Sequence, residues 1–512
     1  MTECGYSHEY NVDKDEKVLY KCPRKSVDGI KGARCEFHNK IYADDKNNHS
    51  SIMNNLRSLI KNNSDPSLEC IGFYIPETLD IPEILGDINT EERMDDEKNG
   101  KKKIEFSKPV YFSFAKFNGK ANFRDVIFHG NAGFSYTKFN KEAIFSNAQF
   151  EREAGFSNAV FSNKAYFNGK SKRERNASTR MKFKGYVNFF NATFKDKVDF
   201  SGCKLEGCEG YPDSKASFTH INFEGDVLFS CAMYSSSIFP PNDEKKEDMK
   251  SDEKKDTEHE RDILLYRMIK GKKSPIIKFD DTVFLGKARF GGDVTTPLQL
   301  GLVSFKGVDL TNITFGSVQW LKKGRFWRRN AIVDEFIRNE NDKKEFLAKE
   351  TKSTRGINAG FFDEISGIYN QLRKNYEARL SFREASDFYI GDMEMTRRKL
   401  SEHSHNAGEK FTGIVYGMHK YLNLYGESTF IPLAIWSPIF IALFALIRFY
   451  EGDWDVNTLG QNFIESLFAY FQFPLPTDNS DWVSVERIVS APILAIAIKS
   501  FALTKRFETA IR

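Results

Sequence analysis

The chain has 512 residues, too many for one compact domain, so we expect about two to four folding units. Its formal net charge is only +4, with acidic and basic residues mixed throughout, which excludes the strongly basic character of many nucleic-acid-binding proteins. The seven cysteines are an odd number, and the polar N-terminus shows no signal peptide. This combination favours reduced thiols in a cytoplasmic compartment.

Residues 1–40 form a polar leader that concentrates possible metal ligands. Cys35 and His38 have the two-residue spacing with which two ligands hold one tetrahedral ion from a single turn. Cys4 and Cys22 could complete a Cys₃His set, and a structural zinc ion would explain how so small a polar segment folds. The alternative is a disordered tail with scattered cytosolic cysteines.

Residues 41–103 have a mixed sequence, in which residues 51–61 could form a short helix, and we expect an irregular linker there. Pro76, Pro82 and Gly86 interrupt any regular element, and residues 91–103 are a charge run typical of a solvated connection.

From Ile104 the chain carries a ladder of phenylalanines whose spacings alternate between six and five residues. A small or β-branched residue stands two positions before each phenylalanine. A helix would need apolar positions three and four apart, whereas this pattern predicts very short strands separated by polar corners. In stacked coils, each phenylalanine would lie on the one a coil away, with strands about 4.8 Å apart. The expected core comprises Phe117, Phe123, Phe128, Phe134, Phe139, Phe145, Phe150, Phe156 and Phe161.

This pattern resembles the pentapeptide-repeat family, whose fold is a right-handed quadrilateral β-solenoid. The sequence departs from the family by a sixth residue in every other unit, which gives 11-residue pairs and about 22 residues per coil. The resemblance implies a mainly β solenoid over residues 104–320, and the number of its rungs, at four per coil, gives about eight coils. The mixed charge of the segment from Pro240 predicts a disordered insertion at 240–276. Similar cysteine-rich leaders precede such solenoids, which favours the zinc site.

Some members of this family mimic DNA, which requires a strongly acidic rod. Between Ile104 and Lys170, basic residues outnumber acidic ones, so we expect no nucleic-acid-related role.

Beyond Ala331 the apolar periodicity becomes helical, and residues 331–400 are expected to form a helical hairpin. A further helix at 408–426 has an apolar face, and its polar face carries Lys410 and Lys420. This arrangement suits a helix lying in a membrane interface.

Residues 430–447 are uncharged and would reach ~27 Å as a helix, close to the thickness of a bilayer core. Residues 488–503 are a second candidate span, interrupted by Lys499. The loop at 451–486 contains acidic residues but no lysine or arginine, whereas basic residues flank both spans. The positive-inside rule therefore predicts that the N-terminal domains and the C-terminus are cytoplasmic and that the loop lies outside.

A span, a short apolar helix at 463–473, a turn and a second span resemble the pore module of two-transmembrane, potassium-channel-like proteins. For residues 428–512 the resemblance implies a homo-oligomer, tetrameric if it is a channel. The sequence lacks the glycine-rich filter needed for potassium selectivity. The candidates for lining a pore are Phe471, Phe473, Pro474, Leu475, Pro476 and Thr477.

Two functions fit these patterns. One is a membrane protein with an ion-channel-like pore, in which the cytoplasmic solenoid is an assembly or sensing domain. The other is a membrane-tethered scaffold whose solenoid binds cytoplasmic proteins, without conductance. The sequence shows no nucleophile–base pair, phosphate-binding loop or catalytic metal cluster, so we expect no enzymatic activity.

Overall fold

The computed structural model of the protein divides into two compact units, residues 1–321 with 332–341, and residues 322–331 with 342–512. We describe each unit by itself. The described residues are 4–13, 16–26, 34–62, 64–86, 104–169, 181–205, 216–233, 277–292, 297–301, 303–324, 328–335, 357–402, 406–428, 430–451, 456–472, 484–492, 494–495 and 498. The predicted insertion at 240–276 lies outside them.

The first unit begins with an antiparallel hairpin and two helices. The elements are β1 (Ser7–Asp13), β2 (Glu16–Lys21), α1 (Lys40–Asp44) and α2 (Lys46–Lys61). Asn39 caps α1 and Asp45 caps α2, each accepting a hydrogen bond from a backbone N–H of the first turn. The apolar side chains of α2 recur three and four positions apart and are buried, so the helix forms by covering a core.

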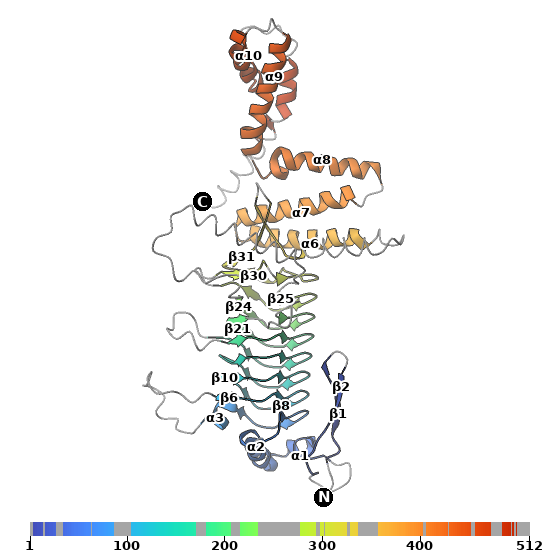
Figure 1. Ribbon diagram of the computed structural model, residues 1–512, viewed down its shortest axis with the longest axis vertical. Coiled ribbons are helices and arrows are strands. Elements are labelled where there is room, and N and C mark those ends of the chain that lie inside the picture. The colour runs from blue at the N-terminus through green and yellow to red at the C-terminus, as the bar shows by residue number, and fades with distance from the viewer. Residues whose placement is uncertain are drawn as a thin grey trace, which may run out of the picture. The chain divides into compact units, whose positions relative to one another are not determined.

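The repeat region forms three parallel sheets whose strands are mostly two or three residues long (Figure 1). The eight-stranded sheet contains β3 (Leu68–Glu69), β7 (Val110–Tyr111), β11 (Ala132–Gly133), β15 (Ala154–Gly155), β19 (Val187–Asn188), β22 (Ala216–Ser217), β25 (Ile277–Lys278) and β29 (Val303–Ser304). The seven-stranded sheet contains β4 (Tyr74–Ile75), β8 (Lys116–Phe117), β12 (Lys138–Phe139), β16 (Val160–Phe161), β20 (Thr193–Phe194), β23 (Asn222–Phe223) and β26 (Val283–Phe284). The twelve-stranded sheet contains β5 (Leu79–Asp80), β6 (Ile104–Phe106), β9 (Ala121–Asn122), β10 (Val126–Phe128), β13 (Ala143–Ile144), β14 (Gln149–Phe150), β17 (Ala165–Tyr166), β18 (Lys182–Phe183), β21 (Val198–Leu205), β24 (Val227–Met233), β27 (Ala288–Phe290) and β30 (Ile313–Phe315).

Successive groups of four strands pair in register, so the repeat region is a parallel β-solenoid. For example, β7, β8, β9 and β10 pair with β11, β12, β13 and β14. Seven strands of the eight-stranded sheet lie within residues 104–320, where about eight coils were predicted, and its eighth strand, β3, belongs to an earlier coil. The right-handed, quadrilateral form of the coil stays a prediction.

The phenylalanine ladder faces inward, as the spacing predicted. All nine predicted core phenylalanines are at most 1% exposed. The ring of Phe145 stacks on those of Phe123 and Phe167, each with centroids 5.0 Å apart, and meets Phe134 and Phe156 edge to face. Each stack joins residues of adjacent coils, because the register places the same position of the repeat one above the other.

One corner of the coil carries a left-handed residue at the same place in each of eight coils. These residues are Gly72, Phe114, Tyr136, Asn158, Asn191, His220, Asp281 and Gly307. Glycine, asparagine and aspartate tolerate this conformation, whereas bulky residues rarely adopt it. Phe114 and Tyr136 adopt it nonetheless, and their rings stack 4.7 Å apart on adjacent coils.

The solenoid starts earlier than the sequence indicated, and residues 41–86 do not form an irregular linker. β3, β4 and β5 pair with β7, β8 and β9 and therefore form part of a first coil. A short helix, α3 (Ile81–Leu85), follows them. The first coil was missed because Cys70, Ile75 and Ile81 stand where later coils have phenylalanine; all three are buried.

After the last coil, a buried carboxyl group completes the first unit. Asp334 Oδ2 accepts a hydrogen bond from the backbone N–H of Phe305 at 3.1 Å. Ser304 Oγ lies 2.5 Å from both Asp334 Oδ1 and Asp280 Oδ1. Burial raises the pKa of Asp334 to about 6, although the hydrogen bonds from Ser304 and Phe305 lower it. A hydroxyl has only one hydrogen to donate, so protonation of Asp334 allows both contacts to be hydrogen bonds.

We expect an Asp334→Asn variant to lose a pH dependence of stability. The pKa of Asp334 is higher in the folded chain than the ordinary value of about 3.9, so its contribution is complete below pH ~4 and declines as the pH rises through ~6. Asparagine does not ionise, so the variant should gain up to about 3 kcal/mol relative to the wild type between these pH values. Urea unfolding at several pH values measures this difference. The exposed Asp309→Asn is the control, and an equal pH profile for both variants would contradict the prediction.

One expectation about the cysteines is wrong. Cys4, Cys22, Cys35 and Cys70 are free and buried, whereas Cys203 is disulfide-bonded. The side chains of the other two cysteines, at positions 208 and 231, lie outside the described part of the chain.

Where the structure describes it, the second unit consists of helices and two strands, and it contains the predicted hairpin. Its elements are β32 (Leu321–Lys323), β33 (Arg329–Ala331), α6 (Ile357–Glu377), α7 (Phe382–Glu402), α8 (Ala407–Asn423), the single turn η1 (Leu424–Gly426), the π-helical η2 (Ile431–Trp436), α9 (Ser437–Glu451) and α10 (Val456–Tyr470). Residues 484–492 are also helical. In the first unit, a two-stranded sheet of β28 (Leu298–Gln299) and β31 (Val318–Gln319) lies beyond the main sheets.

Candidate metal centre and membrane segment

The four predicted metal ligands of the leader come together in one buried cluster. Cys4, Cys22, Cys35 and His38 each offer a ligand atom, and these atoms all lie within 4.8 Å of one another. Cys4 and Cys22 are far apart in the sequence, and the β1–β2 hairpin between them brings them together. Its paired strands bring Cys4 beside Arg24, with a backbone hydrogen bond of 2.7 Å.

Two distances within the cluster match those of a tetrahedral zinc site, and a third is shorter. With Zn–S near 2.3 Å and Zn–N near 2.0–2.1 Å, two sulfurs should lie about 3.8 Å apart, and a sulfur and a nitrogen about 3.6 Å apart. Cys22 Sγ and Cys35 Sγ are separated by 3.8 Å. His38 Nδ1 lies 3.6 Å from Cys4 Sγ and 3.2 Å from Cys35 Sγ.

The surroundings of His38 hold its ring in the orientation that metal binding needs. His38 Nε2 donates to the carbonyl oxygen of Ile71 at 2.8 Å, so the lone pair of Nδ1 faces the three thiols. The ring of Tyr6 stacks on the imidazole with centroids 3.9 Å apart. Because Ile71 belongs to the first coil, the cluster joins the leader to the solenoid.

Without a cation, the Cys35 thiol would remain protonated at neutral pH. Hydrogen bonding to Cys22, together with burial, raises the pKa of Cys35 to about 12, although His38 lowers it. The backbone N–H of Cys35 points at Cys4 Sγ, 3.1 Å away, and would stabilise a thiolate there. The donor set of three sulfurs and one imidazole nitrogen is typical of structural zinc sites.

The predicted pore module has one helix that meets the length and composition of a membrane span. Among the described residues, Ile431–Tyr450 is such a helix, with 20 residues. It would reach ~30 Å. The following helix, α10, begins at Val456, earlier than the predicted start at 463. Half of the second candidate span at 488–503 lies outside the described residues, as do all of the pore candidates at 473–477. Phe471 is 40% exposed.

The helices around this segment place apolar side chains outside and ionisable ones inside. The exposed apolar residues are Ile439, Leu443, Leu446 and Tyr450 on α9, Leu459, Phe463, Ile464, Leu467 and Phe468 on α10, and Val485, Ile488 and Val489 in the helix at 484–492. Inside, Arg448 pairs with Glu486 at 2.7 Å and with Glu465 at 3.4 Å. Ser437 Oγ and the Tyr470 hydroxyl lie 2.7 Å apart.

Two details of this region differ from the sequence-based expectation. Glu486, expected in the outer loop, is 0% exposed and lies against Arg448. The predicted interfacial helix is α8, which leaves Phe411, Val415 and Met418 exposed, whereas Tyr425 beyond its end is buried. The sequence shows the apolar periodicity but not the pairing of charges from distant helices.

Residues 102–149 match a family model described as pentapeptide repeats (9 copies). No curated protein and no solved structure matches the chain. The matched segment includes β6 to β13, where the five- and six-residue spacing and the stacked phenylalanines are regular. Residues 102–149 are thus similar to pentapeptide repeats, and the parallel pairing of short strands seen there continues in the described coils on either side.

Proposed function

We propose that the protein is a membrane-anchored scaffold. The helices from η2 to residue 492 would hold it in a lipid bilayer, and the solenoid would provide a surface on which other proteins assemble. The observation that carries this proposal is the distribution of side chains in the helices, with leucine, isoleucine and phenylalanine exposed and an Arg448–Glu486 pair buried.

This distribution suits lipid better than water. In water, exposing so many large apolar side chains forfeits the hydrophobic stabilisation of folding. In a bilayer the same side chains face hydrocarbon, and ionisable groups turn inward and pair with one another. The exposed Phe411, Val415 and Met418 of α8 would lie in the interface between lipid and water.

The charge bias gives the proposed orientation. Lysine and arginine lie on α7 and α8 and near the C-terminus but are absent from residues 451–486, which favours a cytoplasmic solenoid and an outer loop. The disulfide at Cys203 is a bond that is rare in the cytoplasm. Protease protection in sealed vesicles decides between the two orientations.

The anchor is tested with arginine at two exposed leucines. Leu443 on α9 is 48% exposed and Leu285 on the solenoid is 63% exposed. Arginine at the centre of a membrane span costs about 2.5–3.5 kcal/mol, whereas it costs little on a surface in water. We therefore expect Leu443→Arg to lower the fraction that resists carbonate extraction from membranes, while Leu285→Arg leaves it unchanged. Equal extraction of both variants would reject the anchor.

A channel is the second candidate, favoured by the ionisable groups buried between the helices. It requires a homo-oligomer, tetrameric by resemblance to two-transmembrane pores. Planar-bilayer recording of the purified chain tests it. Conductance would support the channel. If the preparation is monomeric and shows no conductance, the channel is rejected and the scaffold proposal stands without a pore. We assign no enzymatic activity in either case.

We also propose that the cluster of Cys4, Cys22, Cys35 and His38 holds a structural zinc ion. Bound zinc would cross-link the leader through three thiolates and one imidazole. The contact of His38 with Ile71 would then fix this cross-link to the first coil and cap the end of the solenoid.

A further inference from the structure

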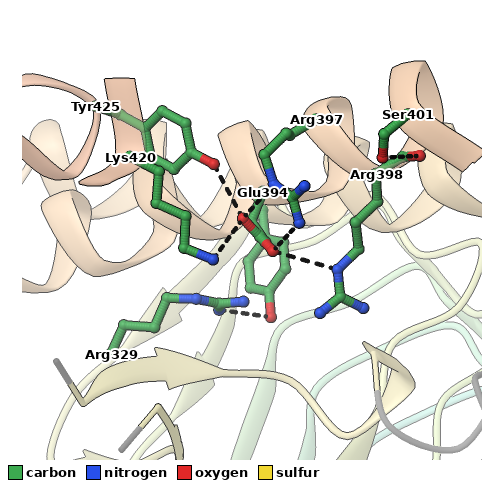
Figure 2. Close-up of polar contacts among 8 residues, drawn as sticks. Arg329, Glu394, Arg397, Arg398, Ser401, Lys420 and Tyr425 are labelled. Carbon is green, nitrogen blue, oxygen red and sulfur yellow. Dashed lines mark hydrogen bonds and ion pairs between the residues drawn. The ribbon is translucent and has the colours of Figure 1, made fainter. Parts of the chain in front are cut away.

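The second unit contains a group of three cations around one carboxylate, which we call the Glu394 cluster. It consists of Glu394, Arg397 and Arg398 on α7, Lys420 on α8 and Tyr425 in η1 (Figure 2). Arg397 donates to both carboxylate oxygens, at 2.8 and 3.1 Å. The other two cations contact one oxygen each. Arg398 Nε lies 3.3 Å from Glu394 Oε1, and Lys420 Nζ lies 3.1 Å from Glu394 Oε2.

The cluster is held in place by backbone that few residues adopt. Leu424 and Tyr425 both have left-handed conformations, with φ of 51° and 60°. Such positions are strained and persist only where the surrounding contacts hold them in place. Here the turn buries Tyr425 and directs its hydroxyl to Glu394 Oε2, at 2.9 Å.

The charges of the cluster do not balance. Glu394 is 8% exposed and contributes one negative charge, whereas three cations surround it, so the cluster has two positive charges in excess. Burial raises the pKa of Glu394, but the hydrogen bond from Arg397 and the charge of Lys420 more than offset this and hold it well below its usual range. The carboxylate therefore stays negatively charged, but its single charge balances only one of the three cations.

The excess charge is partly accessible. The side chains of Arg397, Arg398 and Lys420 are 25%, 22% and 31% exposed. Arg398 contacts Glu394 only through Nε, and among the described residues its other two guanidinium nitrogens have no partner. Figure 2 shows these two nitrogens pointing away from the carboxylate. A guanidinium edge with two parallel N–H groups matches two oxygens of one anion.

We propose that the Glu394 cluster is a binding site for a phosphate group, held by the free edge of Arg398 with Arg397 and Lys420. Phosphate fits better than a carboxylate, because its charge of one to two balances the excess and its oxygens accept from several donors. The group belongs either to a soluble phosphate or to the headgroup of an anionic lipid. The site does not depend on the proposed membrane anchor.

The test titrates inorganic phosphate into the full-length chain in a non-ionic detergent and follows binding by calorimetry. Arg398→Gln and Lys420→Met should bind at least about tenfold more weakly than the wild type. Lys410→Met removes an exposed lysine from the same helix and should bind like the wild type. Arg398→Lys keeps the charge without the planar fork, and an intermediate affinity is expected. Absence of binding to the wild type, or equal binding by all variants, would overturn the proposal.

A second arm identifies the source of the phosphate. The chain is placed in vesicles of phosphatidylcholine, with or without phosphatidic acid, and inorganic phosphate is titrated into each. Displacement of phosphate by phosphatidic acid in the wild type supports a lipid headgroup, and equal binding in both vesicles supports a soluble phosphate. The detergent titration needs no membrane, so its result stands even if Leu443→Arg shows that the anchor is wrong.

Discussion

Replacing Phe145 by alanine should lower the free energy of unfolding of the solenoid by about 3–5 kcal/mol. The ring is 0% exposed and lies between Phe123 and Phe167 of the neighbouring coils, with two further rings edge to face. Alanine removes these contacts and leaves a cavity that the coils cannot close, because their backbones are fixed by hydrogen bonds above and below.

Phe190→Ala is the matched control for this experiment. Phe190 belongs to the same region but is 42% exposed, so its loss should cost less than about 1 kcal/mol. Urea unfolding of both variants, followed by the circular dichroism of the β-structure, gives the comparison. If Phe145→Ala cost no more than Phe190→Ala, the ladder would not form the core of the solenoid.

Cys35→Ser should abolish zinc binding and unfold the leader. Structural zinc contributes on the order of 10–16 kcal/mol to small zinc-binding peptides, and a site with one thiolate missing loses much of this free energy. We expect one zinc per chain in the wild type by elemental analysis and none in the variant. Hydrogen exchange should become faster in β1, β2 and α2, while the distant coils keep their protection.

The control for the metal site is Cys70→Ala. Cys70 is also buried and free but is not among the clustered ligands, so this variant should retain its zinc. His38→Ala should lose it, since Nδ1 completes the tetrahedron. Zinc content that is unchanged in both Cys35→Ser and His38→Ala would remove the metal from the proposal.

The phenylalanine ladder could be predicted because its signal is local and repeated. A spacing of five and six residues leaves few alternatives to a stacked coil, and the in-register pairs lie 22 residues apart, which is the sum of four such spacings. The first coil escaped this reasoning because Cys70, Ile75 and Ile81 replace phenylalanine. Their spacing is still five and six, so a search by period rather than by residue type would have found it.

The candidate sites show the same difference between signals that are local in sequence and contacts that are not. Cys35 and His38 are close in sequence, and their spacing indicated a metal site. By contrast, Arg448 and Glu486, or Glu394 and Lys420, meet only after their helices have packed. No periodic pattern marks such a pair, because each residue alone looks like a charge on a solvated helix face.

The register of the coils makes the length of the solenoid adjustable in whole steps. Asn118 and Asn140, which occupy one position of adjacent coils, are 22 residues apart, whereas Glu151 and Lys184 are 33 apart and still meet at 2.7 Å. Extra chain between coils thus leaves the stacking intact. Removal or duplication of residues 132–153, one full coil, would shorten or lengthen the stack by about 4.8 Å without changing any contact type. A solenoid of this kind can therefore change in length during evolution while the residues at its two ends stay the same.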